Sequence, residues 1–308
     1  MNLRVVFMGS PEFAVPTLRE LFAEFDVIGV VTQPDKPKGR GRKVLPTPVK
    51  MQALSVGLPV AELDNPSSPE FMGILRGWRP DVIVVAAYGK ILPESVLALP
   101  VMGCVNLHAS LLPRHRGASP ISSSILQGDK VTGVCTILMD KGMDTGDILL
   151  KEEIRIRPDD TAGTLHDRLL KPGAELVVRT LKEMMNNKIR PVRQDHSAAT
   201  YTKPLSKADG QVDWNLDSEY LGRLIRAMNP WPGAFCSLRE ETVKIWEAEP
   251  EEGQAVPGRV QAIRTDGVVV GTGHGLLRLG MVQTPAKTKI TGAEFARGRR
   301  LNTSDIFD

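Results

Sequence analysis

The stretch Gly103–Gly117, which reads GCVNLHASLLPRHRG, contains the residues around which the rest of the chain is organised. Its apolar residues 104–107 predict the end of a buried strand, on which Asn106 and His108 lie two positions apart. Side chains two apart on a strand point to the same face, so a carboxamide and an imidazole emerge together. Such a pair at the carboxyl end of a strand is typical of ligand sites in α/β proteins. Taken alone, a histidine such as His108 is as often a hydrogen-bonded structural residue of the surface or core as it is a functional one.

The loop that follows this strand is unusually rich in reactive and rigid residues. Residues 110–113, Ser-Leu-Leu-Pro, form an apolar turn, and 114–117, Arg-His-Arg-Gly, come directly after it. A loop of this composition is more often a site than a simple connection.

Apolar runs and helical patterns alternate on both sides of the stretch. Strands are expected at Leu3–Met8, Val27–Thr32, Leu58–Val60, Asp81–Ala87, Val131–Met139 and Asp147–Ile156. Helices are expected after Ser10-Pro11 and at Pro69–Trp78, Glu94–Leu99 and Thr161–Asn186. Continuous apolar strands that alternate with helices predict a parallel sheet covered on both faces, Rossmann-like in shape. Neither a G-x-G-x-x-G pattern nor a P-loop accompanies it.

A second, smaller domain is expected after a loosely patterned segment. We predict a Rossmann-like domain over 1–188, a linker over 189–207 and a C-terminal domain over 208–308. Several short strands separated by turn residues between 234 and 281 predict a small antiparallel β-barrel.

Composition limits the class of protein. The 308 residues are 42% hydrophobic and 24% charged with a net charge of +3, so a nucleic-acid partner would have to be recognised by local patches. The three cysteines and five histidines show no metal-ligand spacing, and we expect no metal. The chain shows neither a signal peptide nor an apolar run of about 20 residues. We therefore expect a cytoplasmic protein with no membrane association.

The motifs together resemble a known family. Asn106-x-His108, the run 110–117 and Asp144-Thr145-Gly146-Asp147 are similar to the 10-formyltetrahydrofolate-dependent formyltransferases. From Val5–Gly9 to Gly298-Arg299-Arg300 the chain resembles the methionyl-tRNA formyltransferase branch of that family. The resemblance implies transfer of the formyl group of 10-formyltetrahydrofolate to the amino group of methionyl-initiator-tRNA for translation initiation. It also implies an OB-like fold for the barrel, and tRNA and the folate cosubstrate as partners. We expect the protein to be a monomer.

Formyl transfer to an amine requires a proton acceptor and a donor for the developing oxyanion. His108 suits the first role, because imidazole changes protonation state near neutral pH. The carboxamide of Asn106 suits the second, and one such donor is worth about 3 kcal/mol. Asp144 can hold a protonated His108, but beside Gly146 it can equally be a plain turn residue. The resemblance implies the catalytic set Asn106, His108 and Asp144.

The folate site is expected at the same sheet edge. The resemblance implies that residues 110–113 bind the folate, and an apolar wall for the pterin is expected from residues 88–92. The expected contacts are Ser110, Leu111, Leu112, Pro113, Tyr88, Ile91 and Leu92. The alternative for the apolar members is ordinary loop and core packing. Arg116 can serve Asp144, the substrate or a helix end.

A basic loop is expected over Pro34–Lys50. It carries six Lys and Arg residues against the single acid Asp35, and Gly39 and Gly41 favour mobility. Such a loop can clamp phosphates, or it can be a solvated surface loop. The resemblance implies that it enters the acceptor end of the tRNA, with Arg42, Arg40, Lys43 and Lys38 as contacts.

Three alternatives stay open at this point. The run Pro113–Ser119 resembles the hydrolase domain of formyltetrahydrofolate dehydrogenase, and a hydrolase of the same donor is one alternative. A formyltransferase for a small amine such as an amino sugar is a second, and an RNA-binding protein without chemistry is a third. The basic loop and the second domain favour tRNA as the acceptor.

Overall fold

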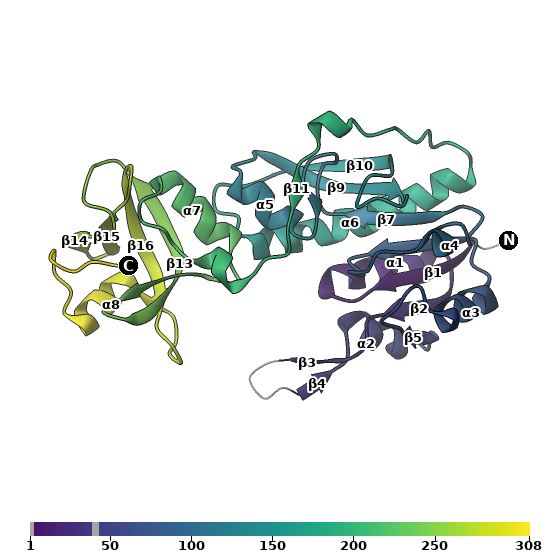
Figure 1. Cartoon of the computed structure of the whole chain (residues 1–308), viewed down its shortest axis with the longest axis horizontal. Coiled ribbons are helices and arrows are strands. Elements are labelled where there is room, and N and C mark those ends of the chain that lie inside the picture. Colours follow the sequence, from purple (N-terminus) through teal and green to yellow (C-terminus); the bar gives the residue numbers. More distant parts are fainter. Residues whose placement is uncertain (1–2, 39–42) are drawn as a thin grey trace. The chain divides into compact units, whose positions relative to one another are not determined.

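The chain forms two compact units in a computed structural model that describes residues 3–38 and 43–308 (Figure 1). The first unit comprises the residues up to Pro120 together with Val131–Arg155 and His166–Lys203. The second comprises Ile121–Lys130, Ile156–Leu165 and Pro204–Asp308.

A seven-stranded sheet forms the first unit, with the strand order β10-β9-β7-β6-β1-β2-β5. Its strands are β1 Arg4–Gly9, β2 Asp26–Thr32, β5 Val60–Glu62, β6 Val82–Ala86, β7 Cys104–His108, β9 Val131–Leu138 and β10 Asp147–Arg155. The five strands from β5 to β7 run parallel, and β9 and β10 add an antiparallel edge. The predicted Rossmann-like sheet is confirmed, including the strands expected at Val131–Met139 and Asp147–Ile156.

Helices connect the parallel strands, as the alternating pattern predicts. They are η1 Glu12–Ala14, α1 Val15–Glu24, α2 Pro48–Ser55, α3 Pro69–Trp78 and α4 Glu94–Leu97. Two further helices, α5 Pro120–Leu126 and α6 Ala162–Met185, come before β9 and after β10. The start of α3 illustrates why they form where they do. The Ser68 hydroxyl accepts a hydrogen bond from the Phe71 N–H, and Pro69 occupies the first helical position. A capping hydroxyl followed by proline is a strong helix-start signal.

The register of β7 places the site residues. Cys104 packs in a cluster with residues of β1 and β6 and with Phe71 and Leu75 of α3. Asn106 and His108 share the face of Cys104, because side chains alternate along a strand. Leu107 faces the other way, where a Cβ on Gly173 of α6 would come within 3.1 Å of it. The two polar side chains therefore continue the α3 side of the sheet towards its carboxyl edge.

The expectation of a loop without secondary structure over Pro34–Lys50 is wrong for the described residues, and the mobility expected from Gly39 and Gly41 concerns residues outside the described ranges. Strands β3 Lys36–Lys38 and β4 Lys43–Leu45 pair antiparallel, and α2 begins directly after the capping Thr47. Each strand spans only three residues, too few for periodicity to reveal it. At the base, the Lys50 ammonium lies 2.8 Å from Asp35 Oδ2 and 2.6 Å from Glu62 Oε1. Residues 39–42 lie outside the described ranges.

We expect Lys50→Met to loosen this hairpin. The side chains of Asp35 and Glu62 would lose the cation between them, so amide exchange over 43–45 should become about fivefold faster. Hydrogen-exchange mass spectrometry checks this, with β1 and β6 as internal references. Unchanged exchange in the hairpin would show that the ion pairs do not hold it.

The second unit contains a small antiparallel barrel. Its strands are β12 Ala234–Leu238, β13 Glu241–Glu251, β14 Val260–Arg264, β15 Gly267–Gly271, β16 Leu276–Gln283 and β17 Ile290–Thr291. They follow the order β12-β13-β16-β15-β14, and β17 pairs with β16. Bridges from Phe307 to Leu238 and from Ile306 to Arg259 join the two outer strands, β12 and β14. The predicted small antiparallel domain is confirmed.

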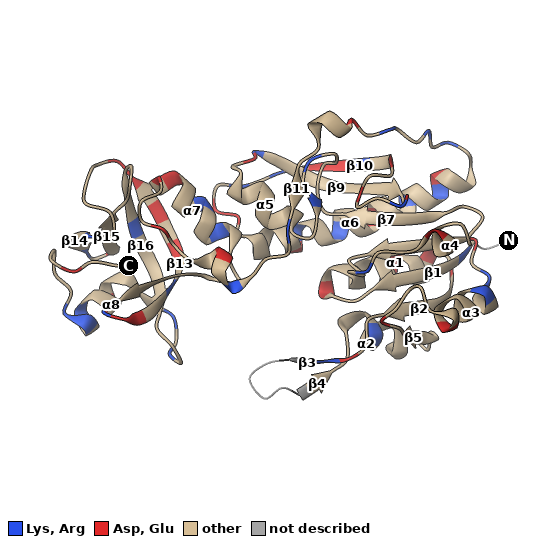
Figure 2. Ribbon diagram, viewed as in Figure 1, with Lys and Arg blue, Asp and Glu red and all other residues tan. Residues whose placement is uncertain are grey.

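The C-terminal part of the second unit, Pro204–Asp308, contains the helices α7 Ser218–Ala227 and α8 Gly292–Arg299. Helix α8 was not expected from the sequence, although Thr291 and Glu294 form a capping box at its start. Acidic residues lie along β13, as Figure 2 shows. Over residues 3–38 and 43–308, no helix has both the length and the apolar character needed to span a bilayer.

Candidate active site

Asn106, His108 and Asp144 converge at the carboxyl edge of the first unit's sheet. Asn106 and His108 end β7 and are 9% and 6% exposed. The Asn106 Nδ2–H donates to Asp144 Oδ1 at 3.4 Å, and His108 Nδ1 lies 3.6 Å from Asp144 Oδ2. Both separations are longer than a good hydrogen bond, which is common in catalytic sites without substrate. The structure thus brings together the three side chains that the resemblance grouped.

Asp144 occupies a turn whose backbone is closely defined. Its φ of 54° lies in the left-handed region, where aspartate is tolerated better than most residues. The Gly117 N–H donates to Asp144 Oδ2 at 2.8 Å. Two residues on, a Cβ at Gly146 would lie 1.9 Å from the Leu138 carbonyl oxygen, so only glycine fits there. The carboxylate is therefore aimed at β7 by its own backbone and by an N–H from the neighbouring loop.

The second ring nitrogen of His108 fixes its tautomer. Nε2 lies 2.9 Å from the His115 carbonyl oxygen, which can only accept a hydrogen bond. Nε2 therefore carries a proton, and in the neutral ring Nδ1 is the basic nitrogen, on the side of Asp144. The His115 N–H in turn donates to the Thr200 hydroxyl at 2.8 Å, which anchors the loop that supplies the carbonyl.

The 110–113 turn packs mainly against protein. The Ser110 hydroxyl is buried and donates to the Arg114 carbonyl at 2.6 Å. Leu112 belongs to a cluster with Cys135, Ile137 and Ile148, and Leu111 packs against that cluster. Pro113 follows a cis peptide bond. The folate contacts expected of these residues stay a prediction.

The three expected contacts after β6 occupy different environments. Tyr88 is buried, its hydroxyl donates to the Leu63 carbonyl at 3.0 Å, and burial raises its pKa to about 12. Leu92 is buried in the same cluster as Cys104. Ile91 is 80% exposed, so of the three it alone offers a free apolar surface.

Arg116 is a buried cation bound by neutral groups. Its guanidinium is 0% exposed and donates from Nη2 to Gln194 Oε1 at 2.7 Å, from Nη1 to the Tyr201 hydroxyl at 3.2 Å and from Nη2 to His196 Nδ1 at 3.2 Å. None of these bonds goes directly to Asp144. They bind Arg116 to the segment that connects α6 to the second unit.

That segment contributes residues which sequence reasoning missed. Residues 192–202 contain η2 His196–Ala198 and β11 Tyr201–Thr202, and β11 pairs with β8 Arg116–Gly117. Gln194 and Thr200 contact the Asp144 turn and the His115 loop. The sequence carries no periodic signal here, since the residues are polar and lie beside prolines, and such a pattern predicts a linker.

Neither a reactive thiol nor a metal-binding cluster accompanies this centre in the part of the chain that the structure describes. Burial raises the pKa of Cys104 to about 12 and that of Cys135 to about 11, so both thiols stay protonated and unreactive. Within the described ranges, no three His, Cys, Asp or Glu residues gather in a metal-binding arrangement. Of the expected tRNA contacts, Lys38 and Lys43 belong to the β3–β4 hairpin, and Arg40 and Arg42 lie outside the described residues.

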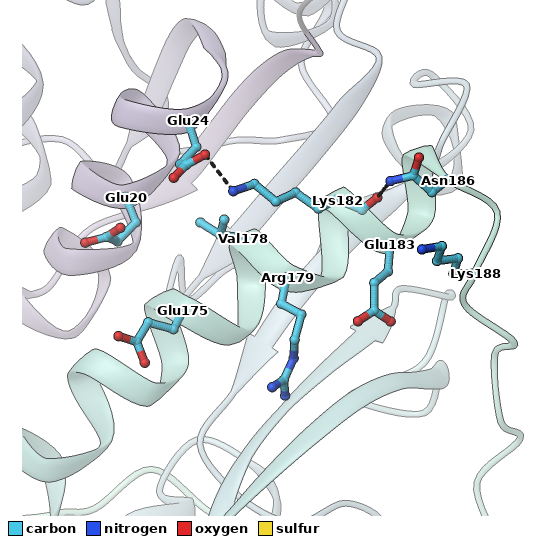
Figure 3. A pocket seen from close by; sticks show the side chains of 9 residues that line it. All are labelled: Glu20, Glu24, Glu175, Val178, Arg179, Lys182, Glu183, Asn186 and Lys188. Atoms are coloured by element: carbon cyan, nitrogen blue, oxygen red, sulfur yellow. Dashed lines mark hydrogen bonds and ion pairs between the residues drawn. The ribbon is translucent and has the colours of Figure 1, made fainter.

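A surface groove of about 470 Å³ lies between α1 and α6 (Figure 3). Its lining mixes both signs of charge, and Lys182 Nζ pairs with Glu24 Oε2 at 2.7 Å. None of the predicted site residues lines it. We assign it no role.

The fold and the cluster at the strand ends match a defined class of enzyme. Residues 3–181 match the formyl transferase family, and residues 204–300 match the formyl transferase C-terminal domain. The chain therefore belongs to the formyl transferase family.

Full-length relatives narrow this class. The chain is 46% identical to a methionyl-tRNA formyltransferase from Caldanaerobacter subterraneus subsp. tengcongensis, over 99% of both chains. It is 43% identical to the methionyl-tRNA formyltransferase of Clostridium perfringens, again over 99% of both. In fold it is similar to an N-formyltransferase from Helicobacter canadensis, solved with folinic acid and dTDP-3-aminofucose. That structure has a TM-score of 0.66 and 18% identity, and the match covers 90% of this chain and 99% of the other.

Proposed function

We propose that this enzyme transfers the formyl group of 10-formyltetrahydrofolate to the free amino group of methionyl-initiator-tRNA. The observation that carries the proposal is the convergence of Asn106, His108 and Asp144 at one sheet edge. The two methionyl-tRNA formyltransferases that the chain matches from end to end support the choice of acceptor.

In the reaction, the neutral amine attacks the formyl carbon and the carbonyl oxygen becomes an oxyanion. Asn106 uses one N–H on Asp144, and its second N–H is available to that oxyanion. His108 Nδ1 takes the proton that the attacking nitrogen loses, and Asp144 offsets the resulting imidazolium charge. Collapse of the intermediate breaks the bond between the formyl carbon and the N10 of the folate. N10 leaves with the proton that His108 took from the amine, and the imidazole becomes neutral again.

The folate is proposed to bind beside β7, between the 110–113 turn and the segment after β6. The exposed side chain of Ile91 supports an apolar contact there. Leu111, Leu112 and Leu92 pack against protein in this structure, so we propose that they shape the walls of the site. The folinic acid in the Helicobacter canadensis structure supports a folate in this fold.

The tRNA is proposed to use both the hairpin and the second domain. The proposed division is a catalytic domain over 1–188, a linker over 189–207 and an OB-like tRNA-binding domain over 208–308. The boundary between the two compact units at Lys203 and Pro204 supports a C-terminal domain that begins near 208, although the second unit also includes Ile121–Lys130 and Ile156–Leu165. Lys38 and Lys43 belong to the β3–β4 hairpin, beside which Lys50 pairs with Asp35 and Glu62, and Arg40 and Arg42 lie between these two lysines in the sequence.

Arg42→Ala is expected to raise the KM for methionyl-tRNA about tenfold, because one phosphate or base contact would be lost. The effect should shrink as salt is raised, and the KM for the folate should not change. Steady-state formylation at two salt concentrations measures this. Arg19→Ala, which removes an arginine from α1, is the control. A change confined to the folate KM would contradict the assignment of the hairpin.

A formylation assay with purified protein, 10-formyltetrahydrofolate and charged initiator tRNA tests the function. A parallel reaction without tRNA reports free formate. Formyl-methionyl-tRNA with little formate in the blank is the expected result. Equal formate with and without tRNA would identify a hydrolase, and formylation of an amino sugar in place of tRNA would identify a small-amine transferase.

A further inference from the structure

The side chain of Gln194 connects the buried Arg116 to the turn that carries Asp144. Gln194 is 4% exposed. Its Oε1 accepts hydrogen bonds from Arg116 Nε at 3.2 Å and Nη2 at 2.7 Å. Its Nε2 donates to the Asp144 carbonyl at 2.8 Å and to the Gly146 carbonyl at 2.7 Å. Both amide hydrogens and both acceptor sites are thus used, so the amide has one orientation.

Arg116 reaches Asp144 by a second path, through its own backbone. The Arg116 N–H donates to the Thr200 carbonyl at 2.8 Å, which places β8. The next residue, Gly117, has a φ of 106° and directs its N–H at Asp144 Oδ2. Asp144 is therefore held on its carbonyl by Gln194 and on its carboxylate by Gly117, and both groups depend on Arg116.

The carbonyls of Asp144 and Gly146 need these donors. Asp144 lies in the left-handed region, which most residues avoid, so the turn persists only where its surroundings define it. The Gln194 N–H groups are a direct means, because they bind two carbonyls two residues apart. Arg116 holds the Gln194 oxygen with two charge-assisted hydrogen bonds, which prevents the amide from turning over.

We propose that Gln194 is a positioning residue for formyl transfer, which sets the direction of the Asp144 carboxylate towards Asn106 and His108. Arg116 acts on Asp144 through Gln194 and through Gly117. This inference rests on the proposed function of the same site. It implies that the segment 192–202 belongs to the catalytic centre and does more than link the two units.

The variant that separates positioning from stability is Gln194→Glu. A carboxylate still accepts from the Arg116 guanidinium, and gains an opposite charge with it, so the fold should persist. It has no hydrogen to give to the Asp144 and Gly146 carbonyls, and its second oxygen faces them as an acceptor. We expect kcat for formylation to fall about 100-fold, as a displaced catalytic group typically costs. The KM values for folate and tRNA should stay within about threefold, since Gln194 touches neither in the proposed site.

The controls isolate the hydrogen bonds from the added charge. Gln52→Glu places the same charge beside another arginine, since Gln52 Oε1 accepts a hydrogen bond from Arg19 Nε at 2.7 Å, and it should leave kcat unchanged. Gln194→Met removes donors and acceptors together, so it should lower both kcat and the melting temperature. A Gln194→Glu enzyme with wild-type kcat would overturn the proposal, and so would a loss of activity matched by an equal loss of folded protein. If the wild-type enzyme itself forms no formyl-methionyl-tRNA, the proposed function fails, and this inference with it.

Discussion

His108→Ala is expected to lower kcat for formylation by about 10³-fold, the usual contribution of a general base. Nδ1 is the basic nitrogen because Nε2 is bound to the His115 carbonyl, and alanine leaves no group to receive the proton of the attacking amine. Folate binding should persist, because the imidazole is 6% exposed and is proposed to face the reacting amine. Single-turnover formylation measures the rate of formyl transfer, and equilibrium titration with 10-formyltetrahydrofolate measures the affinity for the folate.

His274→Ala provides the control for this variant. His274 is an exposed histidine of the second unit, paired with Asp217 at 3.2 Å, and its loss should not affect turnover. Undiminished turnover by His108→Ala would remove His108 from the mechanism. Loss of turnover together with loss of folate affinity would instead assign it to folate binding.

Asp144→Asn should lower kcat by about 10²- to 10³-fold, somewhat less than the loss of His108. Asparagine tolerates the left-handed backbone at this position as well as aspartate does, so the turn should survive. Two donors, Asn106 Nδ2–H and Gly117 N–H, meet the two carboxylate oxygens, and a carboxamide has an oxygen for only one of them. The charge that offsets a protonated His108 is also lost.

The melting temperature of Asp144→Asn decides between chemistry and folding. A value close to that of the wild type, with kcat reduced and KM unchanged, assigns the loss to chemistry. If kcat stays within a factor of two or so of the wild type, Asp144 is a turn residue and has no part in the mechanism.

The strands of the sheet are predictable from the sequence because burial on both faces gives them an unbroken apolar pattern. Alternation along β7 then places Asn106 and His108 on one face from the sequence alone. Asp144 is different. It lies 38 positions from Asn106 in the sequence, and nothing local shows that its turn returns to β7. Only the resemblance groups it with the other two.

Residues that act through tertiary hydrogen bonds are not predictable in this way. Gln194 and Thr200 occupy an aperiodic segment, and their partners lie 48 to 85 positions away. The β3–β4 hairpin was missed because its strands are too short for a period. α8 was overlooked despite its capping box, since it contains two glycines and no long apolar face. Resemblance to the family also does not tell which residues touch the folate and which only shape the walls of its site. Leu92 and Ile91 were both expected as folate contacts, but Leu92 is buried and Ile91 is exposed.

The segment 192–202 has a second consequence, for self-association. β10 is the outermost strand of the seven-stranded sheet, and an open edge can pair with another chain. Val192 occupies the start of that edge through two hydrogen bonds of 2.8 Å with Ile148. The rest of β10 carries charged residues at 151–153 and 155, and Figure 2 shows acidic residues there. The same segment that holds the Asp144 turn therefore also covers the start of the open edge of the sheet.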